Sequence, residues 1–366
     1  MIVIEVIQYG FALLMIVLLT YHLIQSITAL IKKRRVFSHT KKNRRFAIVV
    51  SPTKNKQMIS QSLYSLFGLV YPRNRYDVII CGDCFSKEAT RIAAKMGAVV
   101  VNGDNKPHDD RKCKLQQILE QIMTGSKTYD AIIVVESESL VSGNYLDVIN
   151  YYFDRGSSVV QSNNLILPQT GTGRHDKQQV DLLFNNLFKP PGQIFFNSTM
   201  NSSGSNFCFS TRMLREKLDS FPAIYGDMEY RLLLQLNGIK VDFAPEAVVW
   251  KQRSIKNGAD DLERNLSREN QYALVKRYFP KFLRTAIRHK SLSYFKSALA
   301  LITPSAVSLL GFALLMVGVN IAGWTLGVES LNLIWVWLVA SLLAVTNIFT
   351  GGYAINTYFQ AYKSIV

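Results

Sequence analysis

Two carboxylates, one residue apart, follow an apolar stretch in the middle of the chain. Residues 131–135 read Ala-Ile-Ile-Val-Val, and Glu136-Ser137-Glu138 comes directly after them. A continuous apolar run of this length indicates a buried strand, and open α/β folds bind ligands at the carboxyl ends of such strands. Two carboxylates at that position repel each other unless a cation lies between them. The segment is therefore either a divalent-cation site or a strand end with two solvated glutamates.

Alternating strand and helix patterns surround the acidic segment and predict the elements that position it. Strand patterns are expected at 46–50, 76–80, 98–101, 131–135, 159–161 and 239–244. Helical patterns are expected at 56–69, 86–96, 112–123, 213–219, 225–236 and 260–281, with loops over a substrate site at 163–203. The alternation predicts an α/β fold with a doubly wound sheet.

Three apolar stretches are long enough to cross a bilayer. A basic stretch follows the first of them, and such stretches mark the cytoplasmic side of a membrane. We expect a multi-pass protein of the inner (cytoplasmic) membrane whose α/β domain faces the cytoplasm. The net charge of +16 fits a domain on an acidic membrane surface, and the adjoining membrane segment argues against nucleic acid as a partner.

The expected domains follow from these patterns. They are an N-terminal transmembrane helix (1–31), a basic juxtamembrane linker (32–45), the α/β domain (46–280), an interfacial amphipathic segment (281–297), a transmembrane helix (298–321), an external loop (322–330), a transmembrane helix (331–349) and a cytoplasmic tail (350–366).

Several short segments carry a resemblance to a known family. They are Pro52-Thr53-Lys54-Asn55-Lys56, Asp83, Glu136-Ser137-Glu138, Gly204-Ser205-Asn206-Phe207-Cys208-Phe209, Gly226-Asp227-Met228-Glu229 with the later Ala244-Pro245-Glu246-Ala247, and Asp261-Leu262-Glu263-Arg264-Asn265. In this order, over roughly 46–280, the chain resembles membrane-bound, polysaccharide-synthase-like glycosyltransferases of family 2. The resemblance implies a GT-A fold, which is a mixed sheet with a Rossmann-like nucleotide-binding half, flanked by one N-terminal and two C-terminal transmembrane helices.

The resemblance also implies a role for each matching residue. Asp227 matches the catalytic base, which takes the proton of the acceptor hydroxyl. Glu138 matches the ligand of Mg²⁺ or Mn²⁺, whose charge stabilises the leaving diphosphate. The donor-binding matches are Pro52, Asp83, Glu136 and Arg264. The acceptor-binding matches are Gly204, Ser205, Asn206 and Glu229.

The implied activity is inverting transfer of a hexosyl group from a nucleotide-sugar, most simply a UDP-sugar. The acceptor would be membrane-associated: a lipid-linked sugar, a glycolipid or an exopolysaccharide, with further membrane subunits as partners. Departures from the family pattern keep a second hypothesis open, namely a catalytically impaired scaffold subunit of a polysaccharide or glycolipid assembly complex. These departures are Lys56, Gly226, Asp261, Asn265 and the glutamates at 136 and 138.

Overall fold

The structure is a computed structural model that describes residues 2–31, 40, 42–51, 59–82, 85–101, 111–166, 206–217, 228–251, 259–302, 306–327 and 333–363. The chain divides into two compact units, each described here by itself. The helical unit comprises Met1–Arg34, Leu187–Ser198 and Phe279–Val366, and the sheet unit comprises Arg35–Asn186 and Thr199–Tyr278.

An eight-stranded sheet forms the centre of the sheet unit, in the order β3-β2-β1-β4-β7-β6-β8-β5. The strands are β1 (Phe46–Ser51), β2 (Tyr76–Cys81), β3 (Val99–Val101), β4 (Ala131–Glu136), β5 (Ser139–Val141), β6 (Val159–Ile166), β7 (Phe207–Ser210) and β8 (Val241–Lys251). Strands β1 to β4 are parallel, whereas β7 pairs antiparallel with both β4 and β6. This mixed α/β sheet confirms the predicted fold class.

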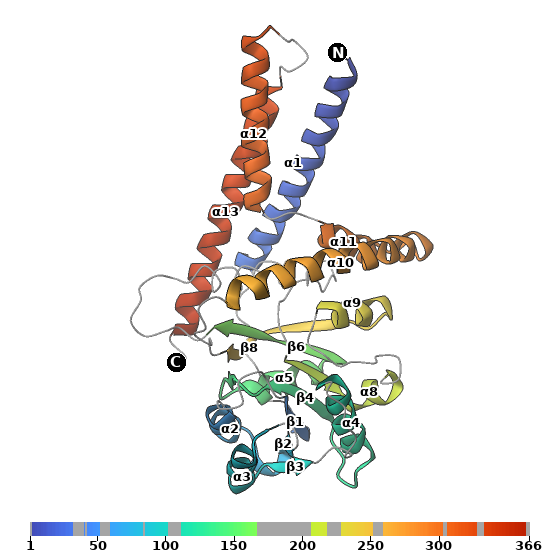
Figure 1. The fold of residues 1–366 in the computed structure, drawn as a ribbon, viewed down its shortest axis with the longest axis vertical. Helices are drawn as coiled ribbons and strands as arrows, with labels where there is room; N and C mark the ends of the chain where they lie inside the picture. Colours follow the sequence, from blue (N-terminus) through green and yellow to red (C-terminus); the bar gives the residue numbers. More distant parts are fainter. Residues whose placement is uncertain are drawn as a thin grey trace. The chain divides into compact units, whose positions relative to one another are not determined.

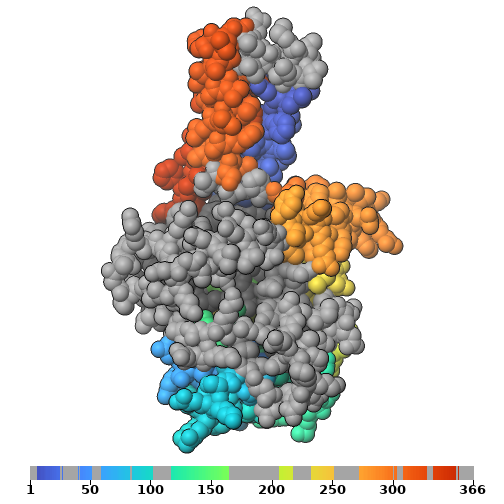
Figure 2. Space-filling view, viewed as in Figure 1, coloured from blue at the N-terminus to red at the C-terminus, as the bar shows by residue number. Residues whose placement is uncertain are grey.

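Helices cover both faces of the sheet (Figure 1). On one face lie α2 (Ile59–Phe67), α3 (Lys87–Lys95) and α5 (Tyr145–Asp154). On the other lie α4 (Arg111–Thr124), α8 (Thr211–Lys217) and α9 (Met228–Leu236). The side chains of β1 alternate between the two cores, since Ile48 packs on the first face and Val49 on the second. A strand buried on both faces is continuously apolar, which explains why the central strands could be recognised. Figure 2 shows the surface around α3, in light blue to cyan.

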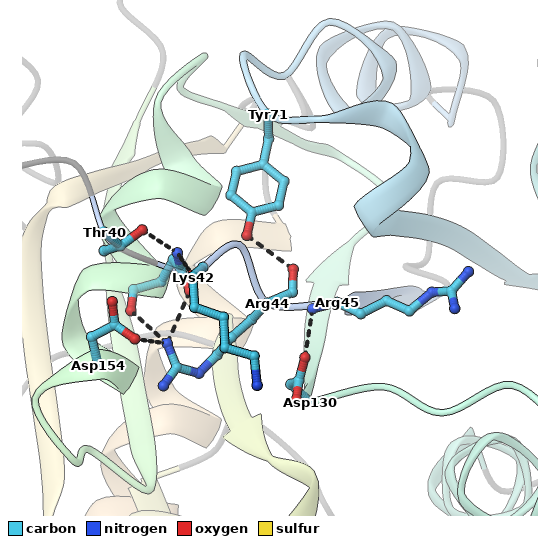
Figure 3. Close-up of polar contacts among 8 residues, drawn as sticks. Thr40, Lys42, Arg44, Arg45, Tyr71, Asp130 and Asp154 are labelled. Atoms are coloured by element: carbon cyan, nitrogen blue, oxygen red, sulfur yellow. Dashed lines mark hydrogen bonds and ion pairs between the residues drawn. The ribbon is translucent and has the colours of Figure 1, made fainter.

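A cluster of polar contacts fixes the start of β1 (Figure 3). The Arg44 guanidinium contacts Asp154 and donates to Asn150 Oδ1 at 3.1 Å, and the Tyr71 hydroxyl donates to the Arg44 carbonyl at 2.9 Å. The Arg45 amide donates to Asp130 Oδ2 at 2.8 Å, next to the first residue of β4. These contacts set the register of β1 against β4, which pairs Phe46 with Ala131 and ends with Ser51 opposite Glu136.

The helical unit contains three helices that are long and apolar enough to cross a membrane, in the part of the chain that the structure describes. The candidate spans are Val6–Ile24 in α1 (Ile2–Ile31), Ser308–Thr325 in α12 (Ala306–Thr325) and Ile334–Gly351 in α13 (Ile334–Lys363). They pack through a shared apolar cluster that includes Leu19, Leu309 and Trp337. Apolar side chains of α12 such as Leu314 and Leu315 are exposed. Figure 2 shows the surface of this helix in orange. The protein is therefore membrane-associated.

Some element boundaries differ from the expectations. The strand expected to end at Ala244 continues to Lys251, because residues 245–247 form a bulge against β6 that accommodates Pro245. Residues 163–166, expected in a loop, belong to β6. The stretch 298–321 contains the end of α11 (Leu292–Ile302) and most of α12, and α10 (Ala259–Arg288) is longer than expected.

Candidate active site

The acidic segment forms a tight turn at the carboxyl end of β4. Glu136 is the last residue of β4, and the Ser137 amide donates to the Ser51 carbonyl of β1 at 2.9 Å. Ser137 and Ser139 are buried, whereas Glu136 and Glu138 are partly exposed. The alternation therefore turns both carboxylates away from the core while the two serines pack into it. We call residues 136–139 the acidic turn.

Strand β8 also supports the acidic turn, because it pairs with β5, which begins at the end of the turn. Ser139 begins β5, which pairs antiparallel with the end of β8 from Val249 to Lys251. Just beyond β5, the Ser142 amide donates to the Val248 carbonyl at 2.9 Å, and the Val248 amide donates to Ser142 Oγ at 3.3 Å. The extension of β8 past its bulge is thus what gives the acidic turn a partner strand.

Asn206 is brought to the acidic turn from the segment before β7. Its side chain is 1% exposed, and its Oδ1 accepts a hydrogen bond from the Glu136 amide at 3.3 Å. Its Nδ2 donates to Asn164 Oδ1 on β6 at 2.6 Å. The structure therefore joins the predicted donor residue Glu136 to the predicted acceptor residue Asn206. It adds Asn164, which the sequence patterns did not single out.

A buried hydroxyl and thiol network lies beneath these residues. The Tyr145 hydroxyl and Ser162 Oγ are 2.6 Å apart, and the Tyr145 hydroxyl is 3.4 Å from Cys208 Sγ. Burial raises the pKa of the Cys208 thiol to about 12, although hydrogen bonds to Tyr145 and Ser162 lower it. Only a thiolate is a good nucleophile. Burial thus keeps the Cys208 side chain in the thiol form, where it packs in the core beside Tyr145.

Helix α9 begins directly after the predicted base, Asp227, which lies outside the described residues. Leu232 and Leu234 of α9 are buried, and the helix ends at Leu236, two residues before Gly238, whose φ is +74°. The Gly238 and Ile239 amides donate to the Gln235 and Leu234 carbonyls at 2.9 Å, which confirms the carboxyl-terminal stop expected at Asn237-Gly238.

The other predicted site residues are not brought together with the acidic turn by the described structure. Pro52, Asp83, Gly204 and Ser205 lie outside the described residues. Glu229 lies on α9 and Arg264 on α10, and only their backbone positions are described. Their roles stay predictions.

The donor atoms of the acidic turn suit a hard divalent cation. Among the described residues, no group of three or more His, Cys, Asp or Glu side chains is placed to hold a metal. Mg²⁺ at phosphate-transfer sites is commonly held by one or two carboxylates, with waters and substrate phosphates completing its ligands. The pair Glu136 and Glu138 meets that requirement for a metal that binds together with a diphosphate.

The sequence matches the family model described as "Glycosyl transferase family group 2" over residues 131–350. The chain belongs to this family. The predicted family is thereby confirmed, and the protein is a family 2 glycosyltransferase. Its match begins at the first residue of β4, so it includes the acidic turn and all of β5 to β8.

Solved structures resemble this glycosyltransferase. The mannosyltransferase PcManGT from Pyrobaculum calidifontis, in complex with GDP-Man and Mn²⁺, is 14% identical, with a TM-score of 0.52 over 95% of this chain and 98% of that chain. TarS 1-349 from S. aureus is also 14% identical, with a TM-score of 0.42 over 87% of this chain and 92% of that chain. The first likeness supports the GT-A fold. A comparison with curated proteins gives no match.

Proposed function

We propose that this protein is an inverting, membrane-bound glycosyltransferase that moves a hexosyl group from a nucleoside-diphosphate sugar to a membrane-associated acceptor. The observation that carries the proposal is the acidic turn at the carboxyl end of β4, held between β1 and β8 in a GT-A sheet. Open α/β sheets bind nucleotides at this edge. The three candidate membrane spans support an acceptor at the bilayer, with the sheet unit on the cytoplasmic side where nucleotide-sugars are found.

In the proposed reaction, Asp227 removes the proton of the acceptor hydroxyl as its oxygen attacks the anomeric carbon. The bond from that carbon to the diphosphate breaks on the opposite face, so the configuration inverts. Glu138 would hold Mg²⁺ or Mn²⁺, whose charge would offset that of the departing diphosphate, and Glu136 would contact the donor sugar or diphosphate. Arg264 would contribute further positive charge, and Pro52 and Asp83 would contact the nucleoside.

The acceptor side is proposed to comprise Gly204, Ser205 and Glu229, whereas Asn206, which is 1% exposed, would lie beneath it and support it. A lipid-linked sugar, a glycolipid or a growing exopolysaccharide would present its hydroxyl there. The donor base is left to a screen that includes both UDP-sugars and GDP-sugars. UDP is the nucleotide that the sequence resemblance implies, and PcManGT was solved with GDP-Man.

The test measures UDP or GDP release by the full-length protein in detergent, with membrane extract as acceptor and Mn²⁺ present. The wild type is expected to release nucleotide from one donor class, and Asp227→Asn is expected to slow release about 100-fold or more, because general base catalysis contributes on that order. Asp242→Asn is the matched control, since Asp242 bonds Ser157 Oγ at 2.8 Å and Lys240 Nζ at 2.7 Å in a structural role.

Two results would contradict the proposal. Asp227→Asn with undiminished turnover would remove the assigned base. No nucleotide release from any donor, together with no thermal stabilisation by UDP or GDP plus Mn²⁺, would instead favour the scaffold subunit, because a ligand that binds the folded state must stabilise it.

A further inference from the structure

The acidic turn has different support on its two sides within the sheet. On the β1 side, main-chain pairing reaches Glu136, which lies opposite Ser51. On the β7 side, main-chain pairing of β4 covers only Ala131, Ile132 and Ile133. The Glu136 amide is therefore beyond the last β7 ladder pair, and its hydrogen bond goes to a side chain, Asn206 Oδ1.

The side-chain amide of Asn206 can form this hydrogen bond in only one of its two orientations. The Glu136 N–H is a donor, so it requires the carbonyl oxygen of the Asn206 side chain. The Asn206 amide nitrogen must then find an acceptor, and Asn164 Oδ1 lies 2.6 Å away on β6. Both asparagines are at most 2% exposed. Water therefore does not compete for these hydrogen bonds. Asn164 holds the Asn206 side-chain amide in the orientation that presents its Oδ1 to the Glu136 amide on β4.

The backbone at Asn206 is held in a conformation that few residues adopt. Its φ is +84°, in the left-handed region where Asn is better tolerated than other residues with a side chain. Its carbonyl accepts from the Ser162 amide at 3.3 Å, so β6 contacts both its main chain and, through Asn164, its side chain. Asn206 thus joins three strands at the point where the acidic turn begins.

We propose that Asn164 and Asn206 form a buried positioning pair that sets the affinity of the acidic turn for its divalent cation. Neither residue contacts the cation. Asn206 fixes the backbone of Glu136, and Asn164 fixes Asn206, so the two carboxylates of the turn are presented in one arrangement. Residues that orient metal ligands in this way typically contribute 10–100-fold to metal affinity. This inference rests on the proposed function.

Asn206→Gly is the most informative variant because it separates positioning from folding. Glycine adopts a positive φ without strain, which offsets part of the lost hydrogen bonding. We therefore expect the fold to be retained and the positioning to be lost. Asn164→Ala removes the orienting partner of Asn206, whereas Asn164→Asp keeps an acceptor oxygen for Asn206 Nδ2.

Asn163→Ala is the matched control for these variants. Asn163 is the neighbour of Asn164 on β6 and is equally buried, but its Nδ2 donates to the Pro245 carbonyl at 3.0 Å. Its loss removes a buried asparagine from the same strand without touching the contact to Glu136.

Binding is measured on the full-length protein by the electron paramagnetic resonance signal of free Mn²⁺, with and without UDP or GDP. We expect Asn206→Gly and Asn164→Ala to weaken Mn²⁺ binding in the presence of nucleotide by about tenfold or more, and Asn164→Asp and Asn163→Ala to stay near the wild type. The half-saturating Mn²⁺ concentration for nucleotide release should rise in parallel, with a smaller change in the saturated rate.

The outcomes distinguish the two proposals. If the wild type binds Mn²⁺ with nucleotide and Asn206→Gly binds it equally well, the positioning pair is wrong while the proposed function stands. If the wild type binds no Mn²⁺ with either nucleotide, the cation site of the proposed function fails, and the role of the pair fails with it.

Discussion

At the residue scale, the molecule places uncharged polar groups where its sheet needs fixed geometry. Ser162 lies on β6 between the Tyr145 hydroxyl, 2.6 Å from its Oγ, and Asn206, whose carbonyl accepts from its amide. Buried polar groups of this kind are costly when a partner is lost, because the remaining group keeps its desolvation penalty. The network should therefore contribute to stability as a unit.

Tyr145→Phe tests this unit. We expect it to lower the free energy of unfolding by about 1–3 kcal/mol, since it leaves Ser162 Oγ and Cys208 Sγ without the tyrosine hydroxyl. Adding Ser162→Ala should cost less than the sum of the two single changes. The measurement is thermal unfolding of the detergent-solubilised chain. Tyr64→Phe, at an exposed tyrosine of α2, is the control and should leave the melting temperature unchanged.

Sequence reasoning finds the acidic turn but not its support, for a physical reason. Glu136 and Glu138 follow an apolar run and carry charge, so both the strand and the chemistry are visible in the residues themselves. Asn164 lies far from them along the chain and matters only because β6, β7 and β4 converge. The run Gln161-Ser162-Asn163-Asn164 was the one available signal, because four polar residues after a buried strand start are unusual.

At the element scale, apolar strands could be predicted, including the three-residue β3, whereas the short strand β5 could not. Strands β1 and β4 are largely continuous apolar runs, as is β2 after Asp77, because helices cover both their faces. Strand β5 has three residues, and its identity comes from its pairing with β8. Helix α5, rich in aromatic and β-branched residues with weak helix propensity, was not predicted. Tertiary packing, which a local pattern does not contain, decides these elements.

Gly238 offers a test of how helix α9 is terminated. Its φ is +74° and nothing lies within 4 Å of an added Cβ, so Gly238→Ala meets backbone strain alone. We expect a loss of about 1 kcal/mol, seen as a melting temperature lower by roughly 2–4 °C.

Gly156, which follows α5, provides the comparison for Gly238. Its φ is +86°, and it likewise has open space around an added Cβ. Gly156→Ala should cost a similar amount, and the two effects should add because the sites are independent. A melting temperature unchanged by Gly238→Ala would show that the left-handed turn after α9 is not required.

At the scale of the whole molecule, three apolar helices form a unit with its own polar contact. Asn347 of α13 is buried, and its Nδ2 donates to the Leu19 carbonyl of α1 at 3.0 Å. It also donates to the Leu343 carbonyl of its own helix at 2.9 Å. An asparagine that bonds across two helices links α1, near the start of the chain, to α13 near its end.

Asn347→Leu should weaken that link. Interhelical hydrogen bonds in membranes contribute about 0.6 kcal/mol on average and at most about 1.7 kcal/mol, so we expect a modest shift to lower SDS in an unfolding titration. Thr346→Ala is the control, because Thr346 Oγ1 donates to the Leu342 carbonyl of its own helix, at 2.9 Å. Equal effects of the two changes would count against a specific α1–α13 contact.

The strand order also has a consequence for how the protein is made. In the sheet, β4 lies between β1 and β7. The ribosome makes β1 before β4 and β7 after it. The acidic turn is also supported by β8, which is made later still. Contacts so distant along the chain form late in folding. During synthesis, α1 can therefore engage the translocation machinery long before the acidic residues acquire their final surroundings. A nascent chain arrested ahead of Val241 would carry both glutamates of the acidic turn but lack β8, the strand that pairs with β5.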